Sequence, residues 1–125
     1  MATNLKKYAR YFLIGFYLIA GSNHLLNPQM YTELIPDYLP YHTLINYVSG
    51  LLEISLALGV AFTKTRYYAA IGIILMLLLF IPSHLFFIKT GSCVEGVLCV
   101  APWVAWLRLV VFHPLLVYWA WLVRK

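Results

Sequence analysis

Charged residues are scarce in this sequence, and acidic residues are the scarcest of them. Only 10% of the 125 residues are charged, with 4 Asp and Glu against 9 Lys and Arg. A typical soluble domain has about a quarter of its residues charged, so the composition argues against a soluble protein. The net charge of +5 does not indicate a nucleic-acid-binding protein, because the basic residues stand at the ends of apolar blocks and form no basic stripe with interleaved aromatics.

Cysteine is scarce as well, and the familiar catalytic motifs are missing. Two cysteines are too few for a disulfide-stapled domain. Without histidines close by they are also too few for a zinc site, so we expect no metal. The sequence contains no pattern typical of nucleotide binding, of Ser-His-Asp hydrolysis or of zinc binding. These absences leave catalytic residues unassigned and direct attention to the apolar part of the chain.

Hydrophobic residues make up 63% of the chain, and they fall into four long blocks. The blocks predict helices at about 8–26, 44–62, 67–88 and 103–123. Each has roughly the ~17–25 residues that a helix needs to cross the hydrocarbon of a bilayer. In lipid, every backbone polar group must be paired within its own segment, which favours helix. The sequence therefore predicts an all-α fold, a four-transmembrane-helix bundle that forms a single domain over residues 1–125.

The basic residues predict the orientation of this bundle. Short cytoplasmic segments are enriched in Lys and Arg. Seven of the 9 basic residues lie at the chain ends and between the second and third blocks: Lys6, Lys7, Arg10, Lys64, Arg66, Arg124 and Lys125. With four crossings these three regions share one side, so both termini are expected in the cytoplasm. The predicted location is the cell (inner) membrane, as a multi-pass protein.

Two connections face the opposite, outer side. The first, residues 27–43, contains three prolines and many apolar residues, and we expect an interfacial segment across the outer mouth of the bundle. The alternative is a surface loop whose tyrosines anchor it to the membrane. The second connection carries Cys93 and Cys99 in an oxidising space, which favours a structural disulfide. A redox-active pair passing electrons to a quinone and two free thiols are the alternatives.

Ionisable residues inside a membrane helix are costly and normally mark a site or a partner. The candidates are His24, Glu53, His84, Arg108 and His113. With a helical rise of about 1.5 Å per residue, all of them fall in the outer half of the bundle or near its middle. This clustering predicts a polar site on the non-cytoplasmic side.

Helical spacing directs Glu53 toward the bundle interior. Asn46, Gly50 and Glu53 share one small, polar face of the second helix, and Tyr17 and His24 share a similar face of the first. A buried carboxylate needs a partner, so we expect a Glu53–Arg108 ion pair with His24 as a third member. A pair that only fixes helix register is the alternative. The expected ligand-binding residues are His24, Glu53, Arg108, Tyr17, Asn46, His84 and His113.

Together these segments resemble the DoxX family of small membrane proteins over nearly the whole chain. The resemblance is carried by Ala20–His24, Asn27-Pro28, Tyr31, Ile35-Pro36, Leu39-Pro40, Ser49–Glu53, Lys64–Arg66 and Trp106–Leu109. It implies a four-helix membrane bundle in which His24, Glu53 and Arg108 are characteristic polar positions. The sequence departs from the family pattern at His84, where members often have Asn, and at Phe112-His113-Pro114, where they often have Gln.

The resemblance also implies two classes of function. Some DoxX members look like membrane subunits of thiosulfate:quinone oxidoreductases or are linked to redox and stress responses, and a distant animal branch is a chaperone for acetylcholine receptors. We therefore expect a protein that binds a quinone or another lipophilic small molecule as an accessory subunit, since the chain has no flavin, haem or cluster motif. The alternative is a non-enzymatic assembly factor or chaperone. Expected partners are the lipid membrane and either another membrane protein or a second copy of the chain, but no nucleic acid.

Overall fold

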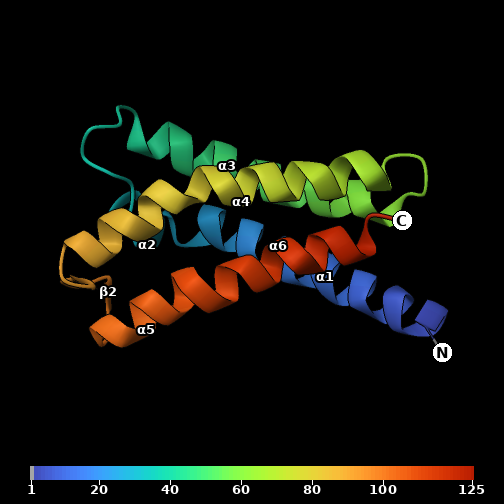
Figure 1. Cartoon of the computed structure of the whole chain (residues 1–125). Helices are drawn as coiled ribbons and strands as arrows, with labels where there is room; N and C mark the ends of the chain where they lie inside the picture. Colours follow the sequence, from blue (N-terminus) through green and yellow to red (C-terminus); the bar gives the residue numbers. More distant parts are fainter. Residues whose placement is uncertain (1) are drawn as a thin grey trace.

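The computed structural model describes residues 2–125, so Met1, the first residue of the expected domain, lies outside it. Regular structure in the described chain is almost entirely helical (Figure 1), which confirms the expected helical fold. The first long helix, α1, runs from Ala2 to Leu26, six residues earlier at its start than predicted. The remaining helical elements are α2 (Pro28–Thr32), α3 (His42–Ala61), α4 (Arg66–Lys89), α5 (Pro102–Leu107), the π-helix η1 (Arg108–Phe112) and α6 (His113–Val123).

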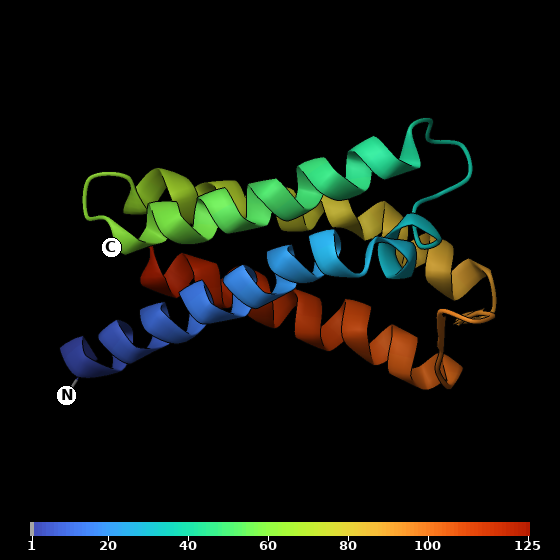
Figure 2. The ribbon, with the colours of Figure 1, turned by 180° about the vertical axis from the view of Figure 1, so that it is seen from behind.

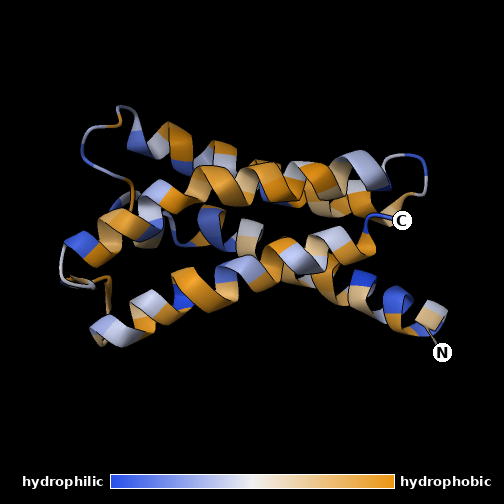
Figure 3. Ribbon diagram, in the orientation of Figure 1, coloured by the Kyte–Doolittle hydropathy of each residue, from blue (hydrophilic) through white to orange (hydrophobic). Residues whose placement is uncertain are grey.

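Three helical segments of residues 2–125 are long and apolar enough to cross a membrane. They are α3, α4 and the continuous rod of α5, η1 and α6, which spans Pro102–Val123. Many of their large apolar side chains are exposed, as Leu79 at 74% and Trp103 at 69% illustrate, and Figure 3 shows that hydrophobic residues predominate along these rods. Such faces are typical of helices in contact with lipid and indicate a membrane protein. The helix α1 falls outside this set, because Arg10, Asn23 and His24 dilute its apolar stretch.

The long helices lie side by side and alternate in direction. The helix α1 packs against α3 and α6, and α4 packs against the same two neighbours. Both termini and the α3–α4 turn lie at one end of the molecule, and α2 lies at the other, as Figures 1 and 2 show from opposite sides. The apolar core of Leu13, Val60, Ile73 and Ala120 occupies the end with the termini. The polar candidate residues are therefore left to the opposite half.

Pro28 ends the helix α1, and the side chains of Thr65 and Arg66 cap the end of α3. Pro28 has no N–H and cannot continue α1, but it suits the first position of α2. At the far end of α3, Arg66 donates from Nε to the Val60 carbonyl at 3.0 Å. Thr65 donates from its hydroxyl to the Gly59 carbonyl at 2.7 Å. These side chains satisfy carbonyls that no later helical N–H can reach.

The first outer connection combines a short helix with an irregular stretch. After α2 the chain buries Ile35 and Pro36, whereas Tyr38 and Tyr41 are exposed. Tyr41 has a left-handed backbone with φ of 58° just before α3 begins. The segment thus packs against the bundle at one end and presents tyrosines at the other.

The second outer connection forms a small hairpin that the sequence did not predict. Strands β1 (Cys93–Val94) and β2 (Leu98–Cys99) pair antiparallel, with Cys93 opposite Cys99. The turn between them places Gly96 at φ of 76°, a conformation that glycine adopts at little cost. The Val97 N–H closes this turn on the Val94 carbonyl at 3.0 Å.

Candidate functional site

The polar candidate residues, which lie toward the end of the bundle opposite the termini, separate into two centres, and the first is built around His24 at the end of α1. His24 Nδ1 lies 2.7 Å from Asn46 Oδ1 on α3, and Asn46 Nδ2 donates to the His24 backbone carbonyl at 2.9 Å. That carbonyl would pair with the N–H of residue 28 in a continuous helix, but residue 28 is proline. The Asn46 amide replaces the missing helical donor and holds the imidazole at the same time.

Glu53 faces the other ring nitrogen of His24. Its Oε1 lies 3.7 Å from His24 Nε2, and only 10% of the His24 side chain and 6% of the Glu53 side chain are exposed. The helices come this close because two glycines meet: a Cβ at Gly50 would lie 2.6 Å from the His24 Cβ and 2.9 Å from the Gly21 carbonyl oxygen. The predicted neighbourhood of His24 and Glu53 is therefore present, on the small-residue faces expected from the sequence.

Two tyrosines complete the His24 centre. The Tyr31 ring stacks on the imidazole with centroids 3.7 Å apart, and its hydroxyl accepts a hydrogen bond from Asn23 Nδ2 at 2.6 Å. Tyr17 is 2% exposed and lies two turns before His24 on the same face of α1. Its hydroxyl and Glu53 Oε2 are buried without a hydrogen-bond partner in the described chain, so the centre retains polar atoms that the fold leaves unsatisfied.

The second centre joins α4 to η1 through Arg108. The guanidinium donates from Nε and Nη2 to His84 Nδ1, at 3.1 and 2.8 Å. Arginine has no acceptor, so His84 Nδ1 carries a lone pair and the ring is neutral, with its hydrogen on Nε2. The Arg108 guanidinium also lies 5.4 Å from the centroid of the buried Phe87 ring, within cation–π range.

His113 connects the second centre to a disturbed turn of α4. Its ring lies 4.9 Å from the His84 ring in an edge-to-face arrangement, and its Nε2 donates to the Leu77 carbonyl at 2.7 Å. Pro82 lies within α4 shortly after Leu77, and a proline disrupts the carbonyls of the turn before it. On the partner rod, η1 ends directly before His113 and Pro114, and π-helical turns often occur at functional positions.

The predicted Glu53–Arg108 pair is wrong. Glu53 faces His24 on α1, whereas Arg108 binds His84 on α4, and no hydrogen bond or ion pair joins the two centres within residues 2–125. The sequence-based estimate compared only the depths of the two side chains. It did not fix the rotation of each helix, which turns Glu53 toward α1 and Arg108 toward α4. His24, Asn46, Glu53 and Tyr17 thus belong to one centre, and Arg108, His84 and His113 to another.

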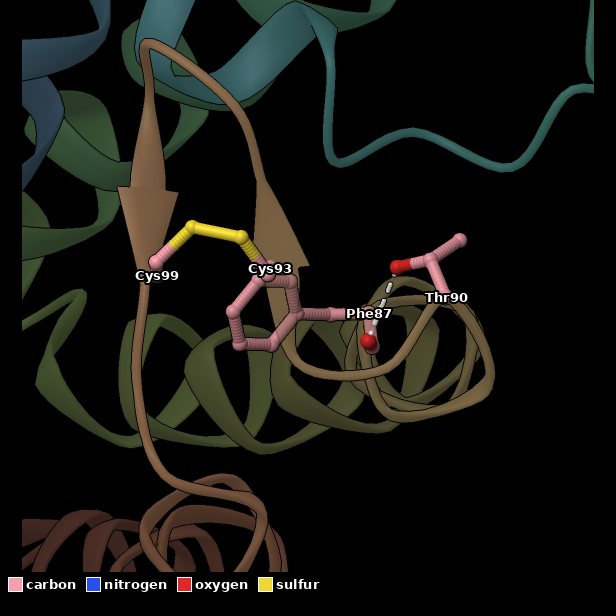
Figure 4. Close-up of a disulfide and its surroundings, with 4 residues drawn as sticks. All are labelled: Phe87, Thr90, Cys93 and Cys99. Atoms are coloured by element: carbon pink, nitrogen blue, oxygen red, sulfur yellow. Dashed lines mark hydrogen bonds between the residues drawn. A yellow bond between two sulfur atoms is a disulfide. The ribbon is translucent and has the colours of Figure 1, made fainter.

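Cys93 and Cys99 form the disulfide that the outer location favoured (Figure 4). Phe87 and Thr90 belong to its surroundings, and the Thr90 hydroxyl donates to the Phe87 carbonyl at 2.9 Å. The Ser92 N–H donates to the same carbonyl, also at 2.9 Å. The hairpin is therefore anchored on the residue whose ring contacts Arg108.

Removal of this disulfide should cost a moderate amount of stability. For a loop this short, with a sequence separation of 6, chain entropy predicts a loss of about 2 kcal/mol in the free energy of unfolding. We expect this loss when Cys93→Ser and Cys99→Ser are combined, as measured by reversible unfolding in detergent. Hydrogen exchange should increase first in residues 90–100. The single Cys93→Ser variant should lose as much stability as the double variant, because either change removes the disulfide. An unchanged unfolding curve would show that the hairpin needs no cross-link.

Tyr31, Phe87 and the Leu77 carbonyl were not among the predicted site residues. The sequence did contain a signal for Tyr31, because this residue follows the Asn27-Pro28 break, after which α2 turns back toward His24. Phe87 lies in an apolar run in which nothing distinguishes it from Phe86. The Leu77 carbonyl is a backbone group that the sequence does not single out, because the missing N–H of Pro82 affects the carbonyl of Leu78 and not that of Leu77.

Comparison with known families shows that both centres lie within the part of the chain that one family model matches. The family model named Domain of unknown function (DUF8561) matches residues 13–124, which include every residue of the two centres. The chain belongs to the DUF8561 family. No curated protein and no solved structure matches this DUF8561 chain. The resemblance to the DoxX family is not tested by the match and stays a prediction.

Proposed function

We propose that this DUF8561 protein crosses the cell (inner) membrane four times, with both termini in the cytoplasm. Support comes from three apolar helices of sufficient length and from α1, whose 25 residues pack along α3 and α6. The chain ends and the α3–α4 turn, which hold most of the basic residues, lie at the same end of the molecule (Figure 1). The positive-inside rule assigns that end to the cytoplasm.

Cysteine labelling tests this topology. In a Cys93→Ser/Cys99→Ser background, we expect Lys64→Cys to react with an impermeant thiol reagent only after the cells are opened. Asp37→Cys, in the first outer connection, should react in intact cells. The two variants control each other, because each has an exposed position in a turn or loop. Labelling of both positions from one side would contradict the four crossings.

We further propose that the protein binds a lipophilic molecule with an oxygen-rich head group, such as a quinone, at Arg108. The observation that carries this proposal is that Arg108, a cation between apolar helices, has a neutral hydrogen-bond partner, His84. Arg108 is only half-buried, and its Nη1 makes no hydrogen bond within residues 2–125. A charge in this setting is expensive unless an acceptor satisfies it.

A quinone meets the requirements of this centre. Its carbonyl oxygens accept hydrogen bonds from guanidinium and imidazole N–H groups, and its ring and tail are compatible with the surrounding lipid. His84 holds the fork of Arg108 in place, so the free donors are oriented before the ligand arrives. The chain supplies no flavin, haem or cluster motif, so we assign it the role of an accessory subunit in a membrane redox system, as the DoxX resemblance implies.

Binding of a fluorescence-quenching ubiquinone analogue to purified protein in lipid nanodiscs tests the proposal. We expect Arg108→Gln to weaken binding by roughly 10- to 100-fold, because a hydrogen bond to a charged group contributes about 1.5–3 kcal/mol. Arg108→Lys should recover only part of the affinity, since lysine lacks the planar fork. Arg124→Gln is the matched control, because Arg124 lies near the C-terminus over Trp121.

If the Arg108→Gln and Arg124→Gln variants bind the ubiquinone analogue with equal affinity, the proposed binding at Arg108 is wrong. Two of the 4 tryptophans, Trp103 and Trp106, precede Arg108 on the same rod, so quenching reports on the second centre when Trp119 and Trp121 are replaced by Phe in all variants. Unfolding curves of both variants show whether any loss of binding reflects loss of structure.

A role as an assembly factor is favoured by one separate observation. Tyr38 and Tyr41, both in the connection between α2 and α3, are 75% and 76% exposed, and tyrosines are frequent in protein interfaces. If this role holds, a membrane partner should co-purify with the wild-type protein but not with Tyr38→Ser/Tyr41→Ser, and no quinone should bind. Quinone binding without a partner would favour the first function.

A further inference from the structure

Hydrogen positions in the His24 centre follow from the chemistry of its groups. Asn46 Nδ2 is a donor and satisfies the His24 carbonyl, so Asn46 Oδ1 is the acceptor toward the ring. His24 Nδ1, at 2.7 Å from that oxygen, must therefore carry the hydrogen. The tautomer of a histidine is set in this way by the partner of one nitrogen, and Asn46 leaves Nε2 as the exchangeable position.

The exchangeable nitrogen faces a carboxyl group in a sealed interface. Glu53 Oε1 lies 3.7 Å from His24 Nε2, and the contact of Gly21 with Gly50 excludes other groups from between the helices. Tyr17 from α1 and the stacked Tyr31 from α2 are the other titratable groups at the centre. A buried net charge is costly, so the pair is either imidazolium with carboxylate or neutral imidazole with carboxylic acid. Both arrangements contain one hydrogen between the two side chains.

We propose that His24 and Glu53 are a proton-exchange pair that shares a single hydrogen, with Asn46 as the positioning residue that directs Nε2 toward Glu53. The transfer breaks the O–H bond of Glu53 and forms an N–H bond on His24 Nε2, and it reverses without any other reactant. Because 3.7 Å exceeds hydrogen-bond length, a small side-chain movement accompanies the transfer. The pair is independent of any ligand at Arg108.

Glu53 Oε2 and the Tyr17 hydroxyl are buried in the same closed contact and have no hydrogen-bond partner among residues 2–125. A structural ion pair would be expected to satisfy its oxygens fully, because an unsatisfied buried atom costs about 1–3 kcal/mol. The unsatisfied oxygen therefore favours an exchange role over a purely architectural one.

Nitrogen NMR of ¹⁵N-histidine protein in bilayers tests the tautomer. Among the 4 histidines, His24 is assigned by its loss in His24→Gln. We expect a hydrogen on His24 Nδ1 in the wild type and in Glu53→Gln, with the Nε2 signal of Glu53→Gln shifted to that of a bare nitrogen. Asn46→Leu should lose the Nδ1 hydrogen signal. Wild-type His24 with a bare Nδ1, or an Nε2 signal that Glu53→Gln leaves unchanged, would overturn the proposal.

Infrared spectroscopy of ¹³C-glutamate protein gives a second test that does not depend on Asn46→Leu folding. The glutamates are Glu33, Glu53 and Glu95, and only Glu53 is buried. In His24→Gln the hydrogen has no imidazole to move to, so we expect the band of the protonated Glu53 carboxyl to grow relative to the wild type. Identical bands in the two proteins would show that no hydrogen is shared. Glu53→Gln identifies the band by its loss.

Discussion

Replacement of Gly50 by alanine should reduce the free energy of unfolding by roughly 2 kcal/mol or more, because the added methyl group overpacks a contact that cannot yield. The new Cβ would lie 2.6 Å from the His24 Cβ and 2.9 Å from the Gly21 carbonyl oxygen. Neither is the flexible end of a side chain, so α1 and α3 must separate. The separation should also pull His24 away from Asn46 and Glu53. Unfolding in detergent, followed by circular dichroism, measures the loss.

Gly15→Ala is the matched control on α1. A Cβ at Gly15 meets nothing within 4 Å, and alanine is favoured over glycine inside a helix by about 0.5–1 kcal/mol. This variant should therefore be as stable as the wild type or slightly more stable. If Gly50→Ala and Gly15→Ala unfold alike, the close contact of the two helices is not a feature of the protein in a membrane.

Truncation of His24 to alanine should cost about 3 kcal/mol, since it leaves the buried polar groups of Asn46 and Glu53 without their partner and opens a cavity beside them. Both Asn46 Oδ1 and Glu53 Oε1 would lose their partner, and the Tyr31 ring would lose its stacking surface. The measurement is again reversible unfolding, now combined with Glu53→Ala. The double variant should lose less than the sum of the two single variants, because the residues share one interaction.

His42→Ala provides the comparison for this variant. His42 is half-buried at the start of α3 and contacts the Pro36 carbonyl at 3.1 Å. Loss of one such hydrogen bond typically costs about 0.5–1.5 kcal/mol. Equal losses for His24→Ala and His42→Ala would mean that the His24 centre carries no special energetic weight.

The apolar blocks made much of the fold predictable. A run of about 20 apolar residues in a membrane forms a helix, because its backbone polar groups must be paired within the segment. The helices α3 and α4 and the α5–α6 rod begin and end within two residues of the predicted bounds. The early start of α1 was not visible, because residues 2–7 contain only Ala2 and Leu5 as apolar residues and carry no periodic apolar face. The hairpin and η1 were not visible either, since each depends on pairing or packing rather than on local composition.

The His24 centre was predictable from the sequence, because it depends on which residues share one face of a helix. The partner of Arg108 was not predictable, because it depends on how the helices are rotated relative to one another. Small residues at Gly21 and Gly50 indicated which faces of α1 and α3 meet, and His24 and Glu53 followed from them. Several polar side chains lie at a depth that Arg108 can reach, and the sequence gives no reason to prefer His84 on α4 as its partner. The role of Asn46 followed only from Pro28, whose missing N–H leaves the His24 carbonyl free.

The central claim is that the polar side chains between the helices form two separate centres, and double-mutant cycles in lipid-like detergent measure it most directly. The cycle of Arg108→Gln with His84→Ala should give a coupling free energy of about 1.5 kcal/mol, the size of a hydrogen bond to a charged group. The cycle of Arg108→Gln with Glu53→Gln should be additive within about 0.5 kcal/mol. A strong coupling between Arg108 and Glu53, with none between Arg108 and His84, would contradict the arrangement described.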